Sequence, residues 1–329
     1  MKKGKLLTLL TLMLLPLGLS GCNNGKEKVI GILQPVEHSA LGAAREGFEK
    51  GLEEAGLKNF KIDFRNAGGN DADLVTLAKN LVDSSDLVLG IGTGASKALQ
   101  GAEVNAGLEK PLLFTAVTDP VDAGLVESAD NPKGFACGTT DANPVEAQIA
   151  LVKEFNPSAS KVGIIYTQKE ENSKVQADQA SAAIAAAGMT SDIKTCLNSS
   201  DISATAEALI SDGVDAIYVP TDNNIAANMN AIKTAVKNHN VLVVCGEENL
   251  LKEGGHVTLS IDYFNLGLST GKMAAQILNG EKKPTDFPVV AVPAENCSFV
   301  YSSKNLADAG LVMPEAMLAA HSWKDANAE

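Results

Sequence analysis

Short apolar runs alternate with amphipathic helical patterns along the chain from residue 29 onwards. This alternation is typical of parallel β-sheets that are covered by helices on both faces. The helical segments end at a glycine or are followed by a proline, as at Gly56. We therefore predict an α/β fold with strands over residues 29–33, 61–65, 87–91, 112–116, 134–138, 162–166, 191–195, 216–219, 241–245 and 257–261.

Most of this pattern occurs twice, at an offset of about 130 residues. The strand at 29–34 and the helix closed by Gly56 match the strand at 162–168 and the helix closed by Gly188. The helix and strand at 72–90 match those at 202–219, and the strand at 112–116 matches the one at 242–245. Two copies of one βαβαβ half predict two doubly wound, Rossmann-like lobes.

The chain continues after the second copy, with a helix predicted at 266–278, strands at 288–292 and 299–302, and a helix near 305–309. This return segment predicts that the backbone passes between the lobes three times, near 139–143, 261–265 and 293–297. The first lobe then comprises residues 29–140 and 264–293, and the second comprises 141–263 and 294–329. A three-stranded hinge of this kind lets two lobes close on a ligand.

The N-terminus has the composition of an export signal. Three lysines precede an apolar stretch at 6–19 and a small-residue cleavage site before Cys22, and the stretch is short for a membrane span. The segment ending at Cys22 resembles a bacterial lipoprotein signal, which predicts a signal peptide over 1–21, lipidation of Cys22 and a tether over 22–28. An ordinary secretory signal with an incidental cysteine is the alternative. Either interpretation places the protein outside the cytoplasmic membrane, and the first anchors it there.

Charge and cysteine content narrow the possible partners. Removal of residues 1–21 takes away three lysines and no acidic residue, so the formal net charge changes from −13 to −16. Nucleic acid is therefore an improbable partner, because its phosphates require clustered basic residues. The other cysteines, at 137, 196, 245 and 297, form no C-x-x-C pair. Buried thiols are the favoured interpretation, with one disulfide as the alternative.

Ligands of open parallel sheets bind beyond the carboxyl ends of the strands, where helix N-termini converge. Applied to both lobes, this rule predicts a cleft between them lined by polar strand ends. The candidates from the first lobe are Gln34, His38, Thr93, Ala95, Ser96, Thr118 and Asp119. Those from the second lobe are Tyr166, Asn172, Ser173, Asp222, Asn223 and Glu247, with Asp262 beside the hinge.

These residues suggest a site for opposite charges. The segment from Thr93 to Ser96 opens a helix whose free N–H groups, with the two hydroxyls, suit a carboxylate. Asp222 or Asp262 would hold an ammonium group. For each of these residues a simple helix N-cap is the alternative role. An aromatic ligand would stack on Tyr166, Tyr218, Tyr263 or Phe264, because Trp323 lies in the C-terminal tail.

Other chemistry has little support in the sequence. Residues 90–95 satisfy G-x-G-x-x-A, but on the third strand and without an acidic strand end about 20 residues later. The sequence contains no H-E-x-x-H motif, and its G-x-S-x-G run at 267–271 lies inside the helix predicted at 266–278 and is not a strand-to-helix nucleophile elbow. We therefore predict no catalytic residues, no metal and no cofactor.

Several stretches resemble one known family. They are Leu33-Gln34 followed by Val36 and His38, the T-D-P motif at 118–120, Tyr166 with 170–173, the D-N motif at 222–223 with Ile225-Ala226, and Leu266-Gly267 followed by 270–272. They are similar to ABC-transporter substrate-binding lipoproteins of the type associated with aromatic amino acids, chiefly tryptophan.

The resemblance implies a type I periplasmic-binding-protein fold and delivery of ligand to a membrane permease with its ATPase. By position, it implies a pocket lined by Thr93, Ser96, Thr118, Asn172, Ser173, Asp222 and Asp262. Two motifs differ from the family's pattern. The usual T-P-A-A run is Thr-Gly-Ala-Ser at 93–96, and the usual H-P-x-L-D run is His-Ser-Ala-Leu-Gly at 38–42.

The leading hypothesis is a monomeric, lipid-anchored protein that clamps a small zwitterion between two lobes. The zwitterion would be an aromatic amino acid such as tryptophan, tyrosine or phenylalanine. The alternatives are a nucleoside or sugar binder on the same fold, and a ligand-gated sensor.

Overall fold

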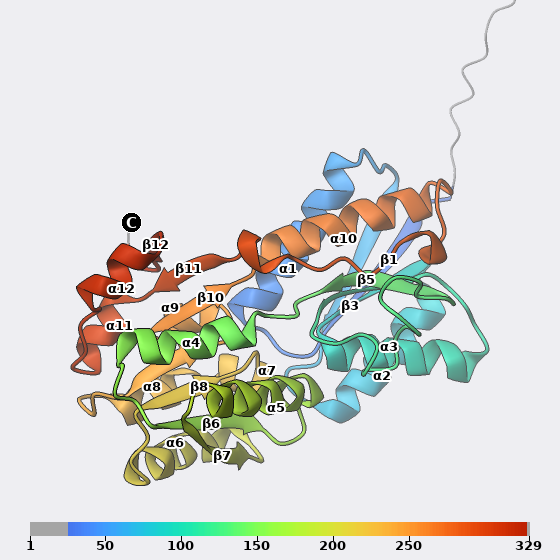
Figure 1. Cartoon of the computed structure of the whole chain (residues 1–329). Coiled ribbons are helices and arrows are strands. Elements are labelled where there is room, and N and C mark those ends of the chain that lie inside the picture. Colours follow the sequence, from blue (N-terminus) through green and yellow to red (C-terminus); the bar gives the residue numbers. More distant parts are fainter. Residues whose placement is uncertain (1–25, 328–329) are drawn as a thin grey trace, which may run out of the picture.

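The computed structural model describes residues 26–327 and divides them into two α/β lobes (Figure 1). The expected signal peptide, Cys22 and most of the expected tether lie outside the described residues. No helix within 26–327 has the length and apolar character needed to cross a bilayer.

Five parallel strands form the sheet of the first lobe, in the order β2-β1-β3-β4-β5. Alternate residues of β1 face opposite layers: Ile30 and Ile32 pack with α1 and α10, whereas Leu33 packs with α2 and α3. The strands are β1 (Lys28–Gln34), β2 (Phe60–Asn66), β3 (Leu87–Ile91), β4 (Leu112–Val117) and β5 (Ala136–Thr140). The helices are α1 (Ser39–Glu54), α2 (Asp71–Ser84), α3 (Thr93–Ala106) and α10 (Tyr263–Leu278).

The sheet of the second lobe begins with the same strand order. It runs β7-β6-β8-β9-β10 and then adds β11, antiparallel to β10, and β12. The strands are β6 (Lys161–Thr167), β7 (Thr190–Cys196), β8 (Ala216–Val219), β9 (Leu242–Cys245), β10 (Val257–Ser260), β11 (Ser298–Tyr301) and β12 (Trp323–Asp325). The helices are α4 (Val145–Phe155), α5 (Glu171–Ala186), α6 (Ile202–Ser211), α7 (Asn223–Ala226), α8 (Asn230–Val236), α9 (Asn249–Glu253), α11 (Ser303–Asp308) and α12 (Glu315–Ala320).

The shared strand order explains the internal repeat of the sequence. The backbone passes between lobes after β5, after β10 and again before β11 (Figure 1). The second passage brings α10 back to the first lobe, where it packs along α1. Glycines at 47 and 51 of α1 face glycines at 267 and 271 of α10. A Cβ atom at any of them would collide with a backbone carbonyl of the other helix. The two helices are therefore unusually close.

The predicted strands agree with the structure apart from small shifts at their ends, with three differences. The strand expected at 134–138 lies two residues later, as β5. The strand expected at 288–292 is absent, and Val290 makes a single bridge to Thr139. Trp323 lies in the short strand β12, where it packs against Phe299 and Tyr301. The four described cysteines are free thiols, three of them buried, so the disulfide alternative is not realised within 26–327.

Candidate functional site between the lobes

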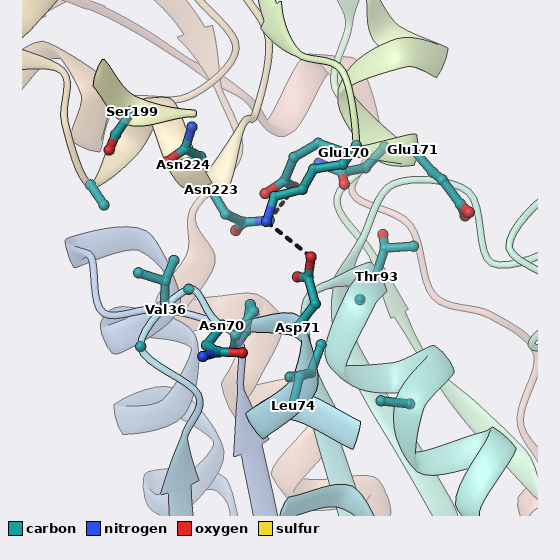
Figure 2. A pocket seen from close by; sticks show the side chains of 18 of the residues that line it. Val36, Asn70, Asp71, Leu74, Thr93, Glu170, Glu171, Ser199, Asn223 and Asn224 are labelled. Carbon is teal, nitrogen blue, oxygen red and sulfur yellow. Dashed lines mark hydrogen bonds and ion pairs between the residues drawn. The ribbon is translucent and has the colours of Figure 1, made fainter. Parts of the chain in front are cut away.

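The two lobes contact each other across the cleft that separates them. In Figure 2, Asn70, Asp71 and Leu74 of the first lobe lie on one side of the cleft mouth, and Glu170 and Asn223 lie on the other. Two ion pairs span this mouth, Lys97 Nζ with Glu171 Oε2 at 2.5 Å and Lys169 Nζ with Asp71 Oδ2 at 3.0 Å. Deeper in the cleft, His38 Nε2 lies 3.1 Å from Asn223 Oδ1. The structure is therefore a closed form.

Closure leaves a small inner cavity of about 20 Å³ between the lobes. Six residues predicted from the sequence line it: His38, Thr93, Asn172, Asp222, Asn223 and Glu247. Eight others complete the lining: Ala40, Leu41, Ala116, Asp141, Thr221, Ala226, Leu250 and Tyr263. Of the proposed stacking residues, Tyr263 is thus the one at the cavity.

Thr93 provides unused hydrogen-bonding capacity at the first-lobe wall. It is the first residue of α3, and its buried Oγ1 has no hydrogen-bond partner within residues 26–327. The first backbone N–H groups of a helix also lack intrahelical acceptors, and they carry the positive end of the helix dipole. These groups together suit a negatively charged oxygen.

Asp222 lies on the opposite wall and is held by its own lobe. It is the N-cap of α7 and accepts from Ile225 N at 2.9 Å, and it also accepts from Thr167 N at 2.6 Å and Thr167 Oγ1 at 2.9 Å. Asp222 therefore does serve as a helix N-cap, and it also lines the cavity. Burial raises the pKa of Asp222.

Two further carboxyl groups line the cavity. Glu247 accepts from the backbone and side-chain nitrogens of Asn249 and from Leu250 N at 3.0 Å, and burial raises its pKa to about 7. Asp141, which follows β5, accepts from Tyr263 Oη at 2.6 Å, and burial raises its pKa as well. Among the described lining residues, His38 is the one basic side chain. The cavity therefore favours a cationic group near these carboxyls.

Ala116 has an unusual backbone conformation at the cavity wall. Its φ is +55°, in the left-handed region, where β4 has an irregular register against β5. A residue with a side chain adopts this region at a cost of roughly 1 kcal/mol. Nothing in the sequence pattern of an apolar strand indicates such a kink.

The structure places four first-lobe candidates outside the cavity lining. Ser96 is fully buried and donates to the carbonyls of Gly90 and Gly92, and Ala95 packs in the core. Gln34 donates to Val36 O, and Asp119 caps the turn that follows it. Successive helix residues are rotated by about 100°, and of the 93–96 run only Thr93 lines the inner cavity.

Four more candidates also lie behind or away from the lining. Thr118 donates to Asp141 Oδ1 at 3.1 Å and therefore supports a lining residue. Ser173 donates to Thr221 O, and Tyr166 packs against the core of the second lobe. Asp262 is exposed and caps α10, accepting from Asn265 N at 3.1 Å.

Gln176 of α5 is a residue of the site that the sequence does not predict. Its side chain links the two lobes. Its Nε2 donates to Thr118 Oγ1 of the first lobe at 3.2 Å, and its Oε1 accepts from Thr221 N at 3.0 Å. Its position, one turn of α5 after Asn172, is the signal by which it could have been found.

No group of residues within 26–327 has the arrangement of a metal site.

Comparison with known proteins identifies the class to which this fold and cleft belong. The family model described as ABC transporter substrate binding protein matches residues 29–323. The chain therefore belongs to the ABC transporter substrate-binding proteins, which are extracytoplasmic components of importers. The type I two-lobed architecture predicted from the sequence is confirmed.

Individual relatives are also similar over most of the chain. The tyrosine-binding protein of Clostridioides difficile is 36% identical over 271 residues, which cover 81% of this chain and 77% of that protein. A Streptococcus pneumoniae ABC domain in complex with L-Trp is 32% identical, covers 91% of this chain and 99% of its own, and superposes with a TM-score of 0.84.

A second solved structure clarifies the state of the cleft. The ligand-free, open structure of a substrate-binding protein with adhesive properties from Clostridium difficile is 33% identical, with 91% and 99% coverage, but its TM-score is 0.67. Identity and coverage nearly equal those of the L-Trp complex, so sequence divergence does not account for the lower score. The lobes of this chain are arranged more like those of the ligand-bound relative.

Proposed function

We propose that this protein binds an aromatic amino acid between the two lobes, among the residues that line the inner cavity, and delivers it to an ABC importer. The observation that carries the proposal is the pairing of an unsatisfied Thr93 hydroxyl at the start of α3 with buried carboxyl groups on the facing wall. The names of the two similar proteins support it, because tyrosine and L-Trp are both aromatic amino acids.

In the proposed complex, the ligand carboxylate accepts hydrogen bonds from Thr93 Oγ1 and the free N–H groups of α3. The ligand ammonium lies against Asp222, with Asp141 and Glu247 adding to the negative potential. Tyr263 offers an aromatic face to the ligand ring. The ligand carboxylate is bound by the first lobe and the ligand ammonium by the second, so only the closed form binds both groups at once.

The proposed cellular setting follows from the export signal. Cys22 would carry the lipid that holds the protein at the outer surface of the cytoplasmic membrane, where a monomer would meet a permease with its ATPase. The protein would act without catalysis and without a cofactor. A Cys22→Ser variant should leave the membrane fraction and lose the lipid mass measured on the mature N-terminus. Retention of both would contradict the anchor.

A thermal-shift screen tests the ligand class. Protein refolded from denaturant, and so free of carried ligand, is screened against the twenty amino acids, nucleosides and sugars. A ligand at a hundred times its Kd stabilises the folded state by about 2.7 kcal/mol, so aromatic amino acids should give the largest increases in Tm. Shifts given by nucleosides or sugars alone would contradict the proposal.

A further inference from the structure

The histidine at the cavity has a defined tautomer. Asn223 Nδ2 donates to Glu170 Oε2 at 2.7 Å, so the oxygen of the Asn223 amide faces His38. The His38 Nε2 atom, 3.1 Å from that oxygen, must therefore carry the hydrogen. Burial lowers the pKa of His38, which keeps the ring neutral at pH 7. A neutral ring protonated at Nε2 presents a lone pair at Nδ1.

No described residue donates a hydrogen bond to the Nδ1 lone pair of His38. This atom is buried and has no hydrogen-bond partner within residues 26–327. A buried acceptor left unpaired destabilises the structure that contains it, and a bound donor relieves that cost. His38 is thus prepared to accept one hydrogen bond, and its side chain lines the inner cavity.

The apolar part of the cavity lies on the side of His38. Ala40 and Leu41 follow it on α1, and Ala226 and Leu250 share with it both the inner cavity and a hollow beside it. Thr93, in contrast, lies where the cavity meets the outer mouth. A ligand whose carboxylate is at Thr93 therefore directs its side chain toward His38.

We propose that His38 Nδ1 accepts a hydrogen bond from the ring of the ligand, a phenol O–H or an indole N–H. The site then selects aromatic amino acids that carry a ring donor and discriminates against phenylalanine. This inference rests on the proposed function and makes His38 the residue that determines specificity within it.

Glu247 is the other acceptor on this side of the cavity. Its carboxylate already accepts three hydrogen bonds, two from Asn249 and one from Leu250. Since a carboxylate offers about four acceptor positions, Glu247 has little capacity left. The empty Nδ1 position of His38 is the better match to a single new donor.

The first test uses the wild-type protein and isothermal titration calorimetry. Tyrosine is compared with phenylalanine and with para-fluorophenylalanine, which lacks the donor but retains a para substituent. We expect tyrosine to bind about 10- to 100-fold more tightly than either, as one hydrogen bond and one relieved acceptor would give. Equal affinities for the three would overturn the inference while leaving the proposed function intact. Failure of tyrosine, tryptophan and phenylalanine all to bind would instead contradict the proposed function.

The second test uses two matched variants. In His38→Asn the amide oxygen can occupy the Nδ1 position, whereas in His38→Gln the amide reaches the Nε2 position and leaves Nδ1 vacant. We expect the tyrosine-to-phenylalanine affinity ratio to persist in His38→Asn and to fall to about threefold or less in His38→Gln. The ratio reports ring recognition, because a purely structural defect weakens both ligands alike.

Two further variants complete the design. His239→Gln changes an exposed histidine before β9 and should leave the ratio unchanged. Glu247→Gln should lower the ratio little. A ratio that persists in His38→Gln but disappears in Glu247→Gln would overturn the inference and assign ring recognition to Glu247. The wild-type comparison with para-fluorophenylalanine remains decisive even if a His38 variant does not fold.

Discussion

The two walls of the cleft differ in how much of their polar chemistry the protein itself uses. On the second-lobe wall, Asp222 accepts three hydrogen bonds from its own lobe, and Glu247 likewise accepts three. On the first-lobe wall, Thr93 Oγ1 and His38 Nδ1 are buried without partners within the described residues. The carboxyl groups are therefore oriented before a ligand arrives, whereas the first-lobe groups gain their partners from the ligand. Mutations on the two walls should accordingly affect stability and affinity differently.

Changes at Asp222 should have the largest effect. Asp222→Ala removes both the proposed counterion of the ligand ammonium and the N-cap of α7, so we expect a loss of affinity of about 3 kcal/mol or more, together with a lower Tm. Asp222→Asn keeps one oxygen that can cap α7, but it removes the charge and turns an NH2 group toward the Thr167 N–H, so affinity should fall and Tm should decrease as well. Calorimetry and thermal unfolding of the pair separate the two roles, and an unchanged affinity in Asp222→Asn would contradict the charge assignment.

The pH dependence of stability should reveal the buried carboxyl groups. The pKa of Glu247 is raised by burial from 4.5 in the unfolded chain to about 7 in the folded protein. The folded state therefore binds more protons between these values, so its stability is greatest below pH 4.5 for this group and declines as pH rises toward 7. The decline should amount to at most about 3 kcal/mol. Urea unfolding across this range should show a flatter profile for Glu247→Gln. An equal slope in both proteins would exclude a raised pKa at Glu247.

Thr93→Val should separate affinity from stability. The substitution keeps the shape of the side chain and removes a buried hydroxyl that the ligand-free protein leaves unpaired. Affinity should fall about tenfold, as for one lost hydrogen bond, while the Tm of the ligand-free protein stays constant or rises. Calorimetry and thermal unfolding measure the two quantities. A lower Tm with unchanged affinity would show that the Thr93 hydroxyl serves the fold instead of the ligand.

The smallest effect is expected at the cleft mouth. Lys169→Ala removes an exposed ion pair between the lobes, which should weaken binding by at most about 1 kcal/mol, and less at high salt. Lys79→Ala is a matched control, because Lys79 pairs with Asp83 within α2 of a single lobe. Affinities measured at two salt concentrations should change for the first variant alone. An equal response in both would show that the mouth pair contributes nothing specific to closure.

The architecture could be predicted well from the sequence because many residues together form the strand and helix patterns and the internal repeat. Strands β3 and β8 occupy the predicted residues, and the internal repeat corresponds to a strand order shared by both sheets. The segment at 288–292 has an apolar strand pattern, but Pro288 lacks a backbone donor, and only Val290 pairs with a neighbouring strand.

The candidate site was harder to predict because it depends on single residues. The predicted strand ends at residue 138 whereas β5 ends at Thr140, so the sequence pattern assigns Asp141 to the hinge and not to a strand end. The sequence predicts Asp262 as a site residue beside the hinge, yet Asp262 caps α10 and its neighbour Tyr263 lines the cavity. Side-chain direction changes from one residue to the next, and composition does not reveal it.

The close packing of α1 against α10 also constrains how the chain acquires its structure. Helix α10 begins at Tyr263, after nearly all of the second lobe, yet its glycines fit against those of α1 at the start of the first. The first lobe therefore cannot complete its core until more than two hundred further residues have been synthesised. Contacts so distant in sequence form slowly. This delay suits a chain that is exported through the cytoplasmic membrane. Its first lobe stays incompletely folded during translocation and can therefore pass through the membrane as an extended chain.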